Sequence, residues 1–78
     1  MIPESFVLAC ANGKHIAAIW LYNTFKIDHS VLNEALDMSP LHIDKWLVKK
    51  GADVHSITKE YYMNKKMRKW FVKQGVIF

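Results

Sequence analysis

The stretch SPLHIDKWLVKKGADVH (residues 39–55) contains the pattern that decides the fold. Ile43, Trp46 and Leu47 stand at positions i, i+3 and i+4, which form one apolar stripe along a helix. Gly51 follows this stripe at the place where helices commonly end in a left-handed residue. The stretch therefore predicts a short helix that buries one side and ends at a tight turn.

The same pattern occurs three times, each time around a tryptophan. The copies are GKHIAAIWLYNTFKIDH (13–29), the stretch above, and MNKKMRKWFVKQGVIF (63–78). An apolar residue precedes each tryptophan by three positions and another follows it directly, namely Ala17 and Leu21, Ile43 and Leu47, and Met67 and Phe71. Because each tryptophan is at the centre of its stripe, we expect all three to lie in the core, namely Trp20, Trp46 and Trp70.

A shorter apolar set precedes each of these helices. Its members are Phe6, Ala9 and Cys10 in the first copy, Leu32, Ala35 and Leu36 in the second, and Ile57 with Tyr61 in the third. Each unit then contains two short helices, and neighbouring units must stack because so short a unit cannot bury its own apolar face. The sequence predicts one all-α domain of six helices without strands, arranged as three stacked helix-turn-helix hairpins over about residues 5–29, 30–55 and 56–78.

Residues that begin and end helices support these boundaries. Ser39 followed by Pro40 is typical of an N-cap and a first helical residue. Asn64 is in a position to cap the last helix. Gly13 and Gly75, like the glycine of the second copy, follow apolar stripes and predict helix ends.

Two of these stretches resemble ankyrin repeats. ACANGKHIAAIWLYNTFKID (9–28) is similar to the family's inner helix, glycine turn and outer helix, and WLVKKGADVH (46–55) is similar to the end of its outer helix and its turn. The resemblance is strongest to the short, Trp-Leu-rich repeats of large viruses and protists. It implies an ankyrin-like solenoid that binds a protein on its concave face. These units are shorter than the family's usual length of about 33 residues, so we expect short turns in place of long fingers.

A second family accounts for the middle copy alone. LNEALDMSPLHIDKW (32–46) resembles the helix-turn-helix of DNA-binding proteins. In that fold Ser39 would cap the recognition helix, and the residues facing the major groove would be Pro40, Leu41, His42, Asp44 and Lys45. This set has a single lysine and includes an acid that phosphate repels, so it is a weak base reader. A nucleic-acid-binding regulator that uses residues 32–46 and a basic C-terminal helix remains the alternative.

The predicted function is binding of another protein, as a small adaptor or inhibitor. Inner helices and turns supply the expected contact residues His29, Asn33, Asp37, Asp53, His55 and Tyr62. The net charge of +4 comes from the end of the chain, where six basic residues and one acid follow Thr58. We therefore expect an acidic surface on the partner to meet Lys65, Lys66, Arg68 and Lys69.

Other functional classes find no support in the 78 residues. The sequence has no phosphate-binding loop, nucleophile motif or zinc-ligand spacing, so we expect neither an enzyme nor a cofactor. The single cysteine, Cys10, suggests a buried thiol in a reducing compartment, and no apolar run is long enough for a membrane span. We expect a cytoplasmic protein, in the host cytoplasm if it is viral, with no membrane contact. Apolar residues lie at both ends, namely Phe6, Val76, Ile77 and Phe78. They predict either a homodimer through the repeat ends or insertion of the C-terminal tail into a partner.

Overall fold

The computed structural model describes residues 2–58 and 63–77, and this part of the chain is helical without any strand. It measures 34 × 19 × 17 Å along its principal axes. The predicted all-α class is therefore confirmed. In chain order, the elements are α1 (Ile2–Ala11), α2 (His15–Thr24), α3 (His29–Met38), α4 (Leu41–Lys49), the short 3-10 helix η1 (Val54–Ser56) and α5 (Lys65–Lys73).

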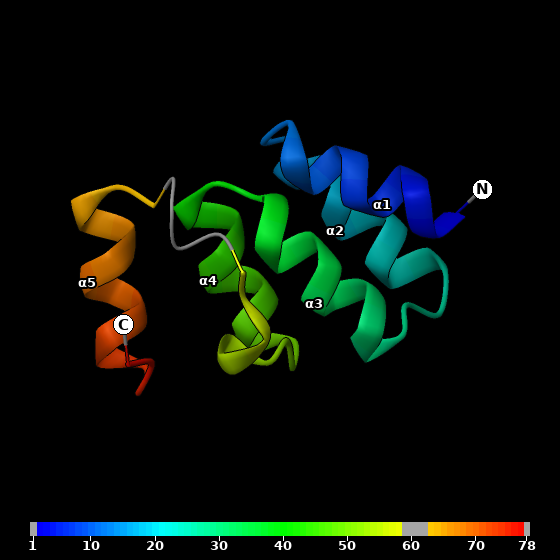
Figure 1. Ribbon diagram of the computed structural model, residues 1–78. Helices are drawn as coiled ribbons and strands as arrows, with labels where there is room; N and C mark the ends of the chain where they lie inside the picture. Colours follow the sequence, from blue (N-terminus) through cyan, green and yellow to red (C-terminus); the bar gives the residue numbers. More distant parts are fainter. Residues whose placement is uncertain (1, 59–62, 78) are drawn as a thin grey trace.

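The first four helices form two antiparallel hairpins that lie side by side (Figure 1). α1 packs against α2 within its own hairpin and against α3 of the next one, and α3 packs in turn against α4 and η1. α5 lies beyond α4, at the end of the molecule opposite α1 and α2 (Figure 1). The long dimension of the molecule therefore follows the order of the hairpins in the sequence.

Glycines end three of the helices, as the sequence predicts. Gly13, Gly51 and Gly75 all have positive φ values, of 72°, 111° and 98°. At Gly51 the N–H donates to the carbonyl of Val48 at 3.1 Å, and the N–H of Ala52 donates to the carbonyl of Leu47 at 3.0 Å. These two bonds satisfy carbonyls that the end of α4 would otherwise leave exposed, and they turn the chain sharply away from the helix.

One of the two predicted N-caps is confirmed and the other is wrong. Asn64 caps α5, because its side-chain oxygen accepts from the N–H of Met67 at 2.8 Å. The prediction for Ser39 is wrong: Pro40 occupies the cap position of α4, and no side chain caps that helix. The hydroxyl of Ser39 instead donates back to the carbonyl of Ala35 at 2.5 Å, a bond that serine readily forms at the end of a preceding helix.

The core runs through both hairpins. All six residues of the inner stripes predicted for the first two units are buried, namely Phe6, Ala9, Cys10, Leu32, Ala35 and Leu36. The outer helices add Ile43 and Leu47 from α4 and Met67 and Phe71 from α5. The shared spacing of the two inner stripes therefore reflects a shared place against the core.

The predicted burial of the three tryptophans is wrong for one of them. Trp46 and Trp70 are partly buried and pack against the core, whereas Trp20 is 58% exposed. Ala17, three residues before Trp20, is exposed too, and α2 turns Ala18 to the core instead. Trp46 packs on α2 of the unit before it, where its ring contacts those of His15 and Tyr22.

The third unit is described only in part. Val54 to Ser56 form η1, and the next two residues, Ile57 and Thr58, are not helical. The predicted inner helix around Ile57 and Tyr61 falls largely on residues 59–62, which lie outside the described residues, as does the predicted contact residue Tyr62. Five α-helices of the six predicted are therefore found in the described part of the chain.

Candidate partner-binding surfaces

Several predicted contact residues lie together along α3, but two of them are engaged within the protein. The side-chain oxygen of Asn33 accepts from the N–H of Asp53 at 2.7 Å. One turn later, the Asp37 carboxylate accepts from the N–H of Thr58 at 2.5 Å and from the Thr58 hydroxyl. Asn33 and Asp37 therefore hold the segment of residues 53–58 against α3.

His29, Asp53 and His55 are more open to solvent than this pair. The imidazole of His29 lies next to Gly51, so that a β-carbon added there would be 3.0 Å from its Nε2. The Asp53 carboxylate accepts from the N–H of His55 at 2.9 Å and caps η1. All three side chains are exposed, so the structure leaves them available for an external contact.

A second surface lies between α4 and α5. A groove of about 250 Å³ is lined by Leu41 and Lys45 of α4 and by Lys66, Lys69, Trp70 and Lys73 of α5. We call this the basic groove. Its lining combines four lysines with two apolar residues, Leu41 and Trp70, which we call its floor, and no carboxylate of the described residues lines it. Of the predicted basic residues, Lys66 and Lys69 line it, whereas Lys65 and Arg68 are exposed elsewhere on α5.

The sequence carries a signal for this groove in the spacing of its lysines. Lys66, Lys69 and Lys73 stand at i, i+3 and i+7, which places them on one side of a helix. Lys45 and Lys69 each come directly before the tryptophan of their own unit, so they have equivalent places on α4 and α5. Lysines at equivalent positions of neighbouring repeats predict one positively charged patch to which both helices contribute.

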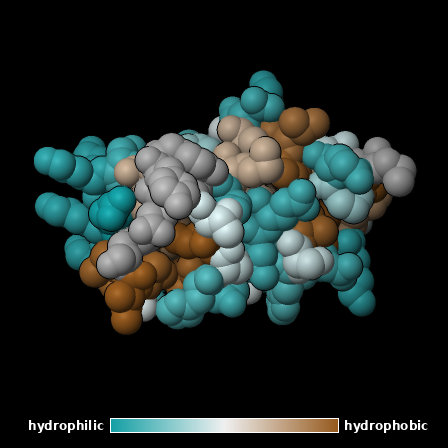
Figure 2. Space-filling view, in the orientation of Figure 1, coloured by the Kyte–Doolittle hydropathy of each residue, from teal (hydrophilic) through white to brown (hydrophobic). Residues whose placement is uncertain are grey.

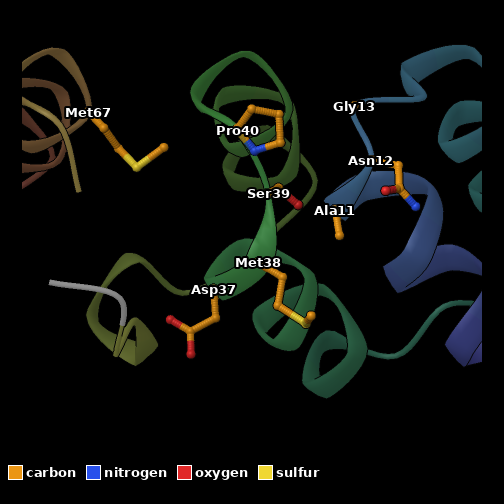
Figure 3. A pocket seen from close by; sticks show the side chains of 8 residues that line it. All are labelled: Ala11, Asn12, Gly13, Asp37, Met38, Ser39, Pro40 and Met67. Atoms are coloured by element: carbon orange, nitrogen blue, oxygen red, sulfur yellow. The ribbon is translucent and has the colours of Figure 1, made fainter. Parts of the chain in front are cut away.

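A larger hollow lies where the turns of the two hairpins meet (Figure 3). It has a volume of about 360 Å³ and is lined by Ala11, Asn12, Gly13, Asp37, Met38, Ser39, Pro40 and Met67. Its polar side chains already serve the fold: the Asn12 amide donates to the carbonyl of Leu8 at 2.9 Å, and Asp37 and Ser39 make the bonds described above. It is therefore a weaker candidate than the basic groove.

The five residues expected to face the major groove in a helix-turn-helix differ in their exposure. Asp44, expected to face the major groove, is fully buried, and Pro40 and Leu41 are partly buried. Only His42 and Lys45 of the five groove-facing residues are exposed.

The thiol of Cys10 is buried between the hairpins, as the sequence predicts. Burial raises its pKa from the ordinary value of 9.0 to about 12, and the nearby Asp44 carboxylate acts in the same direction. A hydrogen bond with Ser39 opposes the rise. Because the thiolate is the nucleophile, this cysteine is poorly suited to catalysis at neutral pH.

Within residues 2–58 and 63–77, no three histidine, cysteine or acidic side chains lie close enough together to hold a metal ion. No helix in that part of the chain combines the length and the apolar character needed to cross a membrane. No protein-family model, curated protein or solved structure matches the chain.

Proposed function

We propose that this protein is a small ankyrin-like repeat module that binds another protein and acts as an adaptor or inhibitor. Two features support the ankyrin-like interpretation. The buried stripes of α1 and α3 have the same spacing and lie against each other, and the glycine turns at Gly13 and Gly51 are those expected after an inner and an outer helix. A rigid arrangement of this kind offers a preformed surface that loses little freedom on binding.

The basic groove is the proposed contact for the partner, and it carries the proposal. Lys45, Lys66, Lys69 and Lys73 are four of the eleven basic residues of the chain, and they line the groove together with its floor of Leu41 and Trp70. Their charges attract carboxylates, while the floor accepts an apolar side chain. The partner would therefore present an acidic segment that includes an apolar residue.

An acidic protein segment fits these features better than nucleic acid. A duplex reader needs base-contacting side chains at the surface, and Asp44 of the expected set is fully buried. The groove is short and contains one partly buried aromatic floor residue, Trp70, whereas single-stranded nucleic acid is held by successive stacking platforms along a basic track. Binding would act by masking the partner's acidic segment or by bringing it to a second protein.

Fluorescence anisotropy with defined probes tests the proposal. One probe is a fluorescein-labelled peptide with a leucine flanked by glutamates, the second is the same peptide with glutamine in place of glutamate, and the third is duplex DNA of random sequence. We expect the glutamate peptide to bind, its affinity to fall as salt rises, and the glutamine peptide to bind much more weakly. The double variant Lys66→Glu/Lys69→Glu should abolish binding.

The matched control is Lys14→Glu/Lys26→Glu, which changes the net charge equally at exposed residues outside the groove. It should retain most of the affinity, because the proposed contact is local. Equal losses in both double variants would show that net charge alone drives binding and would reject the groove. Tighter binding of duplex DNA than of the glutamate peptide would reject the acidic protein partner in favour of the nucleic-acid alternative.

A further inference from the structure

The lysines of the basic groove have no carboxylate beside them among the described residues. All four are exposed, and none forms an ion pair with a carboxylate of that part of the chain, namely Lys45, Lys66, Lys69 and Lys73. Figure 2 shows hydrophilic side chains projecting from the end of the molecule where Figure 1 places α5. The charge of the groove is therefore open to an external anionic partner.

Each of the two helices contributes one row of side chains to the lining. The α5 row extends from Lys66 to Lys73, which is about 10 Å along the helix axis at a rise of about 1.5 Å per residue. The α4 row consists of Leu41 and Lys45, which are one helical turn apart. An occupant that meets both rows therefore presents apolar side chains and carboxylates on one face, over a length of about two helical turns.

The hydrogen-bonding capacity of the lining favours a helical occupant over an extended one. Lysine ammonium groups and the indole N–H of Trp70 only donate, and Leu41 has no polar side-chain atom, so the lining side chains offer no acceptor. The backbone N–H groups of an extended segment need acceptors, which such segments usually find at the edge of a sheet. The described residues contain no strand. A helix bonds its own backbone groups internally, apart from those at its ends, and can bind through side chains alone.

We propose that the segment bound by the basic groove is an amphipathic α-helix whose apolar stripe is bordered by glutamate or aspartate. The stripe would lie on Leu41 and Trp70, and the acidic borders would face the lysines of α4 and α5. Charge complementarity identifies the occupant, because the lining has four lysines and no carboxylate of the described residues. The inference rests on the proposed function, since it assigns a conformation to the acidic segment proposed above.

Three peptides that carry the same leucines and glutamates test the conformation. Each is about two heptads long, with leucine at positions a and d and glutamate at e and g, where like charges keep the peptides from pairing with one another. The first is held helical by a covalent link between two outward positions one turn apart. The second has no link, and the third has proline in the middle of its outward side, where it breaks the helix without changing the groove-facing residues.

Fluorescence anisotropy measures the affinity of the three peptides for the wild type. We expect the linked peptide to bind most tightly, because it loses the least freedom on binding. The proline peptide should bind about tenfold or more weakly than the unlinked one, since it cannot form a continuous helix. A proline peptide that binds as tightly as the linked one would overturn the helical occupant and leave the acidic partner standing. Failure of all three peptides to bind would reject both proposals.

Nuclear magnetic resonance tests whether the linked peptide meets both rows of the groove. Its binding should shift the backbone amide signals of Leu41 and Lys45 together with those of Lys66 and Lys73 and the indole N–H signal of Trp70. Shifts confined to α5 would overturn the inference, because a helix seated in the groove contacts α4 as well.

Charge variants test whether the linked peptide binds at this site. Lys66→Glu/Lys69→Glu should abolish binding of the linked peptide, whereas Lys14→Glu/Lys26→Glu, outside the groove, should retain most of the affinity. Circular dichroism verifies that both variants are folded. Equal affinity of the two folded variants would overturn the inference, since the peptide would then bind elsewhere or through net charge alone.

Discussion

The indole ring of Trp46 meets the imidazole ring of His15 edge to face, with the ring centres 5.3 Å apart and the planes at 71°. This contact connects α4 to α2. The ring of Tyr22, which is also in α2, contacts the Trp46 indole too, with the ring centres 5.5 Å apart. Trp20, the equivalent of Trp46 in sequence, has no such cover. The same residue type at the same place in two units therefore has two different structural roles.

These roles predict a large difference in stability between two alanine variants. Trp46→Ala should lower the free energy of unfolding by about 2 to 4 kcal/mol, because it removes a packed aromatic side chain from between two hairpins. Trp20→Ala should lower it by less than about 1 kcal/mol, since most of its surface is already exposed. Urea unfolding followed by circular dichroism, at a concentration too low for self-association, measures both. Equal losses would show that α2 does not cover Trp46 in solution.

Sequence periodicity predicted the features of the fold that are decided within a single helix. The spacing of Phe6, Ala9 and Cys10 identified buried residues, because a stripe on a short helix must face a core. Gly13 and Gly51 identified helix ends, because few other residues adopt positive φ without strain. Both signals are local, and tertiary packing did not change them.

Two of the failures concern the burial of a side chain, and a third concerns a helix cap. Periodicity places Trp20 on an apolar stripe but does not say how far other elements cover it, and in the structure it is 58% exposed, with Phe25 of its own unit against it. In the helix-turn-helix interpretation Asp44 is expected at the surface, whereas in the structure it is fully buried. Ser39 bonds backwards to α3 instead of capping α4. The basic groove was anticipated in part, through Lys66 and Lys69, while its floor required two helices to be placed together.

The hydrogen bond from Asp53 to Asn33 predicts a local change in backbone protection. Asn33→Ala removes the acceptor at 2.7 Å that fixes the start of the 53–58 segment, so the amide of Asp53 should exchange its hydrogen faster. The loss of global stability should be modest, about 1 kcal/mol, because the bond is exposed to water. Hydrogen exchange read by NMR measures the effect. The amide of Thr58, which donates to Asp37, is the internal control. If hydrogen exchange became equally faster at Asp53 and Thr58, the two hydrogen bonds would not hold the segment independently of each other.

Backbone conformation predicts that Gly51 tolerates substitution less well than Gly13. Gly51 has φ of 111°, outside the left-handed region that asparagine adopts, so Gly51→Asn should lower stability by about 1 to 3 kcal/mol. At Gly13, φ is 72°, and Gly13→Asn should lower it by less than about 1 kcal/mol. Thermal unfolding compares the two. His29→Ala in the Gly51→Asn background should recover little, because the exposed ring can rotate aside; full recovery would identify steric contact as the cause.

The buried thiol of Cys10 predicts how stability changes at high pH. In the folded protein its pKa rises to about 12, mainly through burial, from an ordinary value of 9.0. Between these values the unfolded chain releases the thiol proton while the folded chain keeps it, so ionisation favours unfolding as pH increases. The contribution is fully present below pH 9.0 and is lost progressively as the pH rises toward 12.

The comparison that isolates this effect is between the wild type and Cys10→Ala. Both contain the same lysines and tyrosines, so their common titrations cancel and only the thiol differs. Urea unfolding at a series of pH values should show a constant difference below pH 9.0 and a steeper fall for the wild type above it. Alkylation by iodoacetamide at neutral pH should be slow in the native protein and fast in urea, because the reaction needs an exposed thiolate. Parallel stability curves across the whole range, or rapid native alkylation, would mean that Cys10 is accessible to water.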